Sequence, residues 1–193
     1  MKKICLLITV LFVSLPAGSP GRGPEEISDK DEFARLAELA VSHNSSGRKI
    51  EAVRALEDAI QSIWPDIPLE VRDIRLISNP ASYTVKEDNI YSAGEPIYIT
   101  SRIYGHTLKK DGDCYHINIT TDFLVLGNDG EVLAGQENAY RFDNISPIPK
   151  FDFSLDLNYT LSGLTPGIYR IKSTVNDSNS GESFDFVNPI EIR

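Results

Sequence analysis

The chain has very little cysteine. Its 193 residues include two cysteines, Cys5 and Cys114, and Cys5 lies inside an N-terminal apolar run that is typical of a cleaved signal peptide. Cleavage leaves Cys114 alone, so the mature chain cannot form an intrachain disulfide. Its fold must therefore be stabilised by a hydrophobic core. Cys114 is either a partly buried free thiol or one half of an intermolecular bridge.

Long apolar runs are absent beyond this first segment. The run from Ile4 to Leu15 follows two lysines and precedes small residues, which predicts a signal peptide over residues 1–18. The run is shorter than the roughly 20 residues that a membrane-spanning helix needs. A lipid anchor would need its cysteine directly after the run, whereas Cys5 lies within it. We therefore expect an exported, soluble protein of the periplasm or the cell exterior, with neither a membrane span nor a lipid anchor.

Basic residues are outnumbered by acidic ones. Lys and Arg total 19 against 28 Asp and Glu, which gives a net charge of −9 and a pI near 4.8. An acidic surface repels the phosphates of nucleic acids, so we expect no nucleic-acid partner. The longest basic run in the sequence is Lys109-Lys110, and it is too short to change that expectation.

Motifs for catalysis and for metal binding are also missing. There is no Gly-x-Ser-x-Gly elbow, no phosphate-binding glycine loop and no recognised triad spacing. His106, Cys114 and His116 supply too few ligands for zinc. The acidic turns at 111–113 and 177–181 lack the spacing of an EF-hand. The sequence therefore predicts a protein that is not an enzyme, with no catalytic residues, no metal site and no cofactor.

What is present begins with two helices. Residues 19–27, rich in Pro and Gly, predict a flexible lead-in, and residues 28–65 predict a helical hairpin that Pro65 ends. Each helix has an apolar face of helical period. These faces consist of Phe33, Leu36, Ala37, Ala40 and Val41 in the first helix, and of Ile50, Val53, Leu56, Ile60 and Ile63 in the second. Two roles remain open for the hairpin, docking on the rest of the molecule or self-association.

The period changes from helical to alternating after Pro68. Between Phe151 and Ser162 apolar and polar residues alternate six times, which predicts a strand with one buried and one exposed face. Further strands are expected near residues 69–78, 96–104, 114–126, 131–135, 168–175 and 182–192. Because no helices separate these strands, residues 68–193 predict a mainly β fold. We expect an antiparallel Greek-key sandwich of immunoglobulin-like type, preceded by the helical hairpin.

Turn residues support this assignment. Asn128-Asp129-Gly130 is typical of a tight hairpin. Tyr169 follows a Pro-Gly turn at the start of a strand, which predicts a tyrosine corner in which its hydroxyl group donates to the preceding backbone. Pro189 indicates that the last strand is interrupted or lies at a sheet edge.

Several of these segments carry a resemblance to a known class. They are Gly94 to Ile97, Asp122 to Leu133, Leu161 to Tyr169, and Ser180-Gly181. With them, residues 69–193 resemble exported bacterial proteins of uncharacterised function that contain an immunoglobulin-like or fibronectin-like sandwich. The resemblance implies a fold and carries no functional residues.

The most specific functional hypothesis is a binding surface. On strand 96–104 the isoleucines are natural core positions, so Tyr98, Arg102 and Tyr104 should point outward; on strand 114–126 the same applies to His116 and Asp122. If the two strands are neighbours, these five side chains converge on one exposed face. Tyr and Arg are enriched among residues that dominate binding energy. We therefore expect a non-catalytic module that binds an envelope or extracellular protein, or alternatively a glycan that stacks on the tyrosines.

Overall fold

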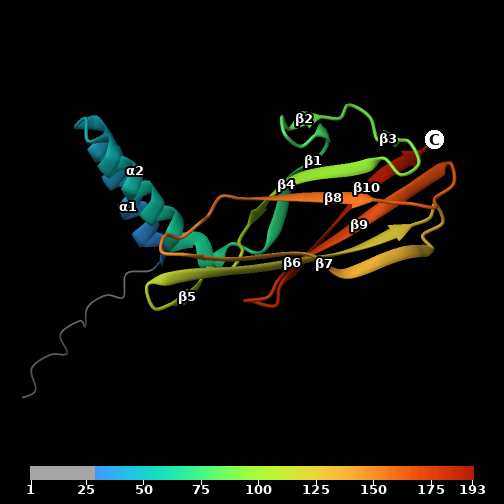
Figure 1. Cartoon of the computed structure of the whole chain (residues 1–193). Helices are drawn as coiled ribbons and strands as arrows, with labels where there is room; N and C mark the ends of the chain where they lie inside the picture. Colours follow the sequence, from blue (N-terminus) through green and yellow to red (C-terminus); the bar gives the residue numbers. More distant parts are fainter. Residues whose placement is uncertain (1–28) are drawn as a thin grey trace, which may run out of the picture.

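The computed structural model describes residues 29–193, and the predicted signal peptide and lead-in (1–18 and 19–27) lie outside the described residues. The fold is mainly β, with two helices followed by two packed β-sheets (Figure 1). The helices are α1 (Asp29–Ser45) and α2 (Lys49–Ile63), and the short 3₁₀ helix η1 (Trp64–Asp66) follows them. Within the described part of the chain, no helix has the length and apolar character that crossing a bilayer requires.

Ten strands form the two sheets. They are β1 (Glu70–Asn79), β2 (Thr84–Val85), β3 (Ile90–Tyr91), β4 (Pro96–Tyr104), β5 (Lys109–Asp111), β6 (Cys114–Leu126), β7 (Val132–Ser146), β8 (Phe153–Thr160), β9 (Gly167–Asp177) and β10 (Ser183–Ile192). Sheet I has the order β2-β1-β4-β8. Sheet II has the order β3-β10-β9-β6-β5, with β7 also paired to β6. All pairs are antiparallel except β3 with β10.

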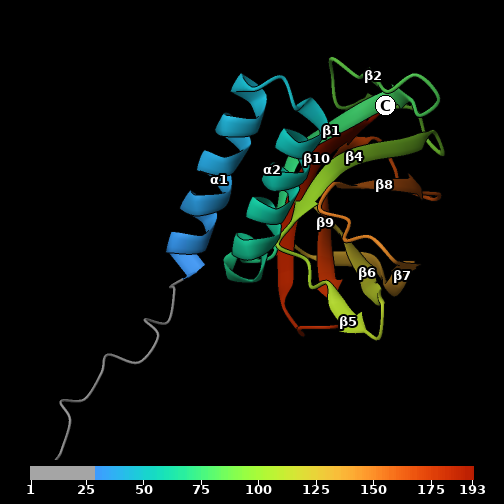
Figure 2. The ribbon, with the colours of Figure 1, turned by 90° about the vertical axis from the view of Figure 1, so that its left-hand side faces the viewer.

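The core lies between the two sheets, which form two layers in Figure 2. Sheet I contributes alternate residues of β4 and β8, and sheet II contributes alternate residues of β6, β9 and β10. This is the consequence of the two-residue period of a strand, which sends every second side chain to the same face. The fully buried members include Ile97, Ile99, Leu155, Ile119, Ile171 and Ile190.

The alternation predicted strands well where one face is buried. β4 and β6 have the predicted bounds, and the predicted strand over 151–162 is β8. The prediction for β7 was wrong in length, because the strand continues from 135 to Ser146. Its first half is exposed on both sides and is held by pairing with β6, so it has no alternation to recognise. The short strands β2, β3 and β5 were not predicted, since two or three residues cannot show a period.

The predicted turns are present. Gly130, with φ +94°, closes the tight connection between β6 and β7. The tyrosine corner is confirmed, because the hydroxyl group of Tyr169 donates to the carbonyl oxygen of Thr165 at 2.8 Å. β10 runs uninterrupted through Pro189, and beyond β9 it is paired only at Glu191 and Ile192, so Pro189 lies on an open edge as predicted.

We expect Tyr169→Phe to lower the free energy of unfolding by about 1 kcal/mol, because the substitution removes one buried hydrogen bond and leaves the carbonyl of Thr165 without it. Urea denaturation followed by circular dichroism measures the difference. Thr165→Val is the matched control, since it removes only the side-chain hydroxyl group of Thr165, which lies 3.3 Å from that of Tyr169, and keeps the backbone acceptor. A tyrosine variant as stable as the wild type would show that the corner is dispensable.

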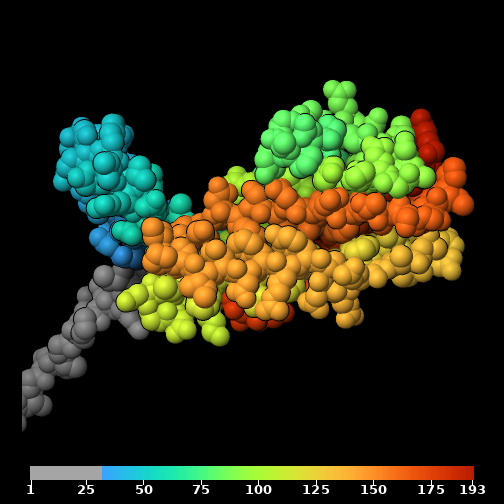
Figure 3. Space-filling model, viewed as in Figure 1, coloured from blue at the N-terminus to red at the C-terminus, as the bar shows by residue number. Residues whose placement is uncertain are grey.

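The helices join the sandwich at one end (Figures 1 and 3). The indole Nε1 of Trp64 donates to the carbonyl oxygen of His106 at 2.8 Å, and the Gln61 side chain donates to the hydroxyl group of Tyr115 at 3.2 Å. Gly105 has φ +68°, and a Cβ atom there would overlap the carbonyl oxygen of Pro68. This position therefore needs glycine, because the two chain segments approach closely. The hairpin does not cover the outer face of either sheet.

Candidate functional site

The structure divides the predicted binding residues between the two sheets. Tyr98, Arg102 and Tyr104 lie on β4 in sheet I, as predicted on its outer face, while His116 and Asp122 lie on β6 in sheet II. β4 pairs with β1 and β8, so the two strands are not neighbours and the five side chains do not converge. The alternating pattern gives the face of each residue but not the order of the strands.

Asp122 has a structural role in sheet II. Its carboxylate accepts hydrogen bonds from the backbone N–H of Asn138 at 2.7 Å and from the side chain of Asn176 at 2.9 Å. These contacts fix the left-handed residue Asn138 (φ +50°) in β7 against β6. His116 is half-buried on the same strand. Neither residue forms part of a hollow with the outer face of sheet I.

The β4 residue Arg102 instead lies in a hollow of about 260 Å³ on the outer face of sheet I. We call this hollow the outer basin. Its polar lining comes from β1, β4, β8 and the turn before β2, and consists of Asp73, Arg75, Tyr83, Thr100, Arg102 and Ser154. The basin is open to solvent, so a ligand would contact it from one side.

Asp156 on β8 fixes one wall of the basin. Its Oδ1 accepts from the Thr100 hydroxyl group at 2.6 Å, and its Oδ2 accepts from the Tyr83 hydroxyl group at 2.9 Å. The hydrogen bond to this carboxylate raises the pKa of Tyr83 above its ordinary value. The phenol donates to Asp156, and its ring is 55% exposed at the edge of the basin.

Arg102 is held from two sides. Its Nη2 donates to Asp152 at 3.0 Å, and its guanidinium carbon lies 5.4 Å from the centre of the Tyr104 ring. The hydrogen bond with Asp152 raises the pKa of Arg102 further above its ordinary value. Planar guanidinium groups held in this way match carboxylate groups geometrically.

Two further arginines lie beside Arg102. Arg72 is directly opposite Arg102 in the β1–β4 pairing, and Arg75 is opposite Thr100. Arg72 is paired with Glu70 at 2.8 Å, whereas Arg75 forms no ion pair with any residue in the described range 29–193. The sequence shows no basic run here, because the three arginines come together only when β1 pairs with β4. A run of consecutive basic residues is therefore not needed for arginines to lie side by side.

Unusual backbone conformations border the basin. Asp73 and Tyr83 have φ of +53° and +51°, in the left-handed region that side chains rarely adopt. Asp73 lies at a break in the β1–β4 register between Arg72 and Arg75, which is a β-bulge. Bulges and left-handed residues occur often next to functional sites because they redirect side chains. Here they aim the arginines and Tyr83 at the same hollow.

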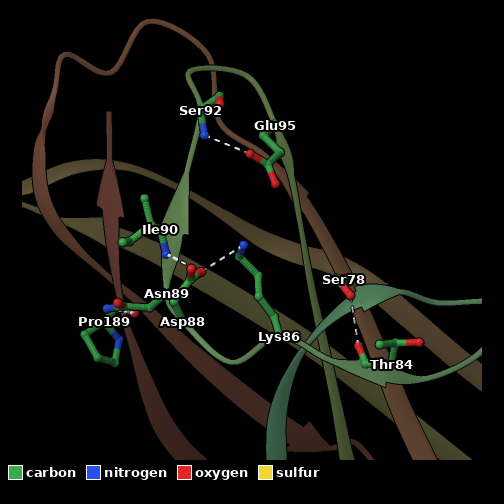
Figure 4. A network of polar contacts seen from close by, with 9 residues as sticks. All are labelled: Ser78, Thr84, Lys86, Asp88, Asn89, Ile90, Ser92, Glu95 and Pro189. Atoms are coloured by element: carbon green, nitrogen blue, oxygen red, sulfur yellow. Dashed lines mark hydrogen bonds and ion pairs between the residues drawn. The ribbon is translucent and has the colours of Figure 1, made fainter.

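The segment that carries Tyr83 is anchored on both sides (Figure 4). Before the basin, the Ser78 hydroxyl group donates to the carbonyl oxygen of Thr84 at 3.3 Å. After it, Lys86 pairs with Asp88 at 2.9 Å, and the Asn89 side chain donates to the carbonyl oxygen of Pro189 at 3.1 Å. The last of these contacts joins the segment to β10 in the other sheet. The segment that forms this wall of the basin is therefore held in place by the rest of the fold.

Tyr83, Asp156 and Arg75 were missed by the sequence analysis. Asp156 was placed on the exposed face of its strand, which is correct, but exposure alone did not mark it. Tyr83 lies in an Asn-Pro turn, where no period assigns a direction. The one signal in the sequence was this turn, whose aromatic residue sits between two short strands.

The residues weighed as metal ligands have other partners. His106 is fully buried, and its Nε2 lies 2.8 Å from the carbonyl oxygen of Lys150. Asp177 is buried, and its carboxylate accepts from the backbone N–H groups of Thr107 and Asn179 at 2.7 and 2.9 Å. No group of three His, Cys, Asp or Glu residues placed to hold a metal ion occurs between residues 29 and 193. Cys114 is a half-buried free thiol at the start of β6.

No protein-family model matches the chain, and no curated protein matches it significantly. Solved structures show weak likenesses. The DNA glycosylase AlkC of Pseudomonas fluorescens is 10% identical with a TM-score of 0.39, and the match covers 85% of this chain and 47% of that one. This chain thus spans about half of AlkC.

Two further solved structures match about two thirds of this chain. A CARDB domain from Pyrococcus furiosus, in complex with di-metal ions, is 16% identical with a TM-score of 0.33, and the match covers 65% of this chain and 87% of that one. A Niemann-Pick type C2 protein of the Japanese carpenter ant is 10% identical with a TM-score of 0.38, over 66% and 94% of the two chains. Likenesses of this size assign neither a family nor a function.

Proposed function

We propose that this protein is an exported, non-catalytic binding module that captures a protein partner through the outer basin of sheet I. The observation that carries the proposal is the convergence of Arg75, Arg102 and the fixed phenol of Tyr83 on one exposed hollow. Arginine and tyrosine supply both stacking area and hydrogen-bond donors. They are the residue types expected at the centre of an interface.

The charges of the basin favour an acidic segment of the partner. Arg75 forms no ion pair within the described residues 29–193, and Arg102 is already oriented by Asp152. Asp73 in the lining and Asp156 beside it limit the positive charge of the basin, and the whole chain carries a net charge of −9. A carboxylate of the partner is therefore attracted to the guanidinium group of Arg75 itself, which gives the interaction one preferred position. We propose a ligand segment that presents Asp or Glu side chains.

The proposal of a non-catalytic role is supported by the carboxyl groups. Glycosidases and other acid–base enzymes need a carboxyl group with a raised pKa. In the described part of the chain, the carboxyl groups with a clear shift are Glu32, Asp88 and Asp185, and hydrogen bonds from cations lower the pKa of each. We also propose that the sandwich is immunoglobulin-like with Greek-key connections, which the tyrosine corner supports.

A binding experiment with matched variants tests the basin. An array of acidic, neutral and basic 12-residue peptides is probed with wild type, Tyr83→Ala, Arg75→Ala and Arg141→Ala. We expect binding to acidic peptides, at least about tenfold weaker in the two basin variants. Arg141→Ala is the control, because Arg141 is an exposed arginine of β7 in the other sheet. Binding that raised salt leaves unchanged, or that Arg141→Ala weakens equally, would reject the basin as the site.

A second candidate function is carbohydrate binding at the same face. The exposed ring of Tyr83, with Thr100 and Ser154 beside it, resembles the combination of stacking and hydroxyl contacts that sugars require. A glycan array that includes uronic acids distinguishes the two functions. If the protein binds glycans and no peptides, the result favours a carbohydrate ligand and rejects the proposed protein partner.

A further inference from the structure

The second helix buries its small residues and exposes its large ones. Ala52, Ala55 and Ala59 face α1, and Ala59 is 2% exposed. On the adjacent side of the same helix, Val53 is 54% exposed and Leu56 is 50% exposed. Burying large apolar side chains gives more stability than burying alanine. In a single chain, the side chains of α2 that would contribute most to stability on burial therefore remain exposed to water.

The first helix extends this surface. Leu36 and Ala40 pack toward α2, whereas Val41 is 66% exposed and Phe33 is 39% exposed. With about 3.6 residues per turn, Phe33 and Val41 lie on the same rotational side of the buried residues in α1 as Val53, Leu56 and Ile60 do in α2, and the helices are antiparallel. These side chains therefore share one side of the hairpin, whereas Leu39 and Ile50 lie outside it. This hairpin face consists of Phe33, Val41, Val53, Leu56, Ile60 and the half-buried Ile63.

We propose that the hairpin face binds the hairpin face of a second copy of this chain, forming a four-helix bundle that links two sandwiches. The six side chains expose on the order of 500 Å² of apolar surface, which is large for a patch that stays in water. Two such faces would bury on the order of 1,000 Å² together, where specific interfaces begin. The hairpin projects from one end of the sandwich (Figure 3).

The spacing along α2 fits a helix partner. Val53, Leu56, Ile60 and Ile63 follow one another at intervals of three, four and three residues, the seam of a coiled coil. The stripe is also symmetric, with its centre midway between Leu56 and Ile60. In an antiparallel pair around a two-fold axis at that point, Val53 of one copy lies near Ile63 of the other, and Leu56 lies near Ile60.

Other occupants of the face fit less well. Residues 29–63 hold seven acidic and five basic side chains, whereas helices that lie on anionic bilayers are rich in Lys and Arg. Residues 19–28 contain one large apolar side chain, Ile27, which is too few to cover the face. A second copy supplies a matching apolar face of equal size.

The oligomeric state of the full chain tests the proposal. Light scattering after size exclusion at about 50 μM should show a dimer for the wild type. Val53→Glu combined with Ile60→Glu should weaken it on the order of 100-fold, because two copies would bury four unpaired carboxylates. Arg35→Glu is the matched control, since it changes the net charge equally, and Arg35 lies beside Asp58 and Ser62 on the other side of the hairpin, so the dimer should stay intact. A wild type that is monomeric at this concentration, or a dimer that the two glutamates do not affect, would overturn the proposal.

Cross-linking tests the two-fold axis. In a chain with Cys5 and Cys114 replaced by Ser, Leu56→Cys combined with Ile60→Cys should form a disulfide-linked dimer under mild oxidation, because the axis brings residue 56 of one copy within disulfide range of residue 60 of the other. Glu51→Cys, on the opposite side of α2, should remain monomeric. Equal cross-linking of both variants would show collisions without a defined interface and would count against the dimer.

Discussion

Replacing Asp177 by alanine should lower the free energy of unfolding by about 3–4 kcal/mol, because three hydrogen-bond donors would lose the buried carboxylate that is their common acceptor. Its two oxygens accept from the N–H groups of Thr107 and Asn179 and, at 3.0 Å, from the Ser180 hydroxyl group. The turn after β9 is thereby joined to the segment after β4. Without the carboxylate, backbone donors that are shielded from water would have no acceptor.

Chemical denaturation of the full chain at neutral pH measures this loss. Asp185→Ala is the matched control, since Asp185 accepts from Lys172 at 2.6 Å and from Thr174 at 2.6 Å but lies at the surface. Surface pairs of this kind contribute less than about 1 kcal/mol. Similar losses in the two variants would contradict a special role for Asp177.

Lowering the pH from 7 to 5 should destabilise the fold through His106. Burial between the rings of Trp64 and Phe153 disfavours the imidazolium and lowers the pKa of His106 below its ordinary value of 6.5. As the pH falls through about 6.5, the imidazole of His106 therefore binds a proton in the unfolded chain but not in the folded chain. Stability is complete above that pH and falls below it, by up to about 1.4 kcal/mol per pH unit, until the folded-state pKa is reached.

His106→Gln isolates this contribution, because glutamine can still donate to the carbonyl oxygen of Lys150 but does not titrate. We expect the variant to be less stable than the wild type at pH 8, since a flexible amide fills the aromatic site poorly. Between pH 7 and 5 its stability should fall less steeply. Parallel curves for the two proteins would assign the acid sensitivity to other groups.

The sequence predicted those parts of the fold in which local pattern and burial agree. The alternation over 151–162 and the Pro-Gly turn before Tyr169 depend on neighbouring residues, and both are confirmed. The outer basin depends on contacts between distant residues. Tyr83 and Asp156 are 73 positions apart and meet only because β1, β4 and β8 are adjacent in this order. No periodicity specifies that order.

The helical hairpin shows a different limit. The apolar pattern of α2 was predicted correctly, but the pattern does not say which apolar residues face the partner helix. Ala55 and Ala59 allow α1 and α2 to approach closely, so the alanines are buried and Leu56 is not. Pattern methods assign the largest residues to the interior of a single molecule. They cannot distinguish that interior from a surface shared between two molecules.

The junction at Trp64 has a spectroscopic consequence. The chain has one tryptophan, and it is buried where the helices meet the sandwich. All eight tyrosines lie beyond it, between Tyr83 and Tyr169. The emission of the indole thus reports whether the hairpin is seated, while tyrosine absorbance reports the sandwich. One unmodified sample therefore contains separate optical probes, one for movement of the helical hairpin relative to the sandwich and one for unfolding of the sheets.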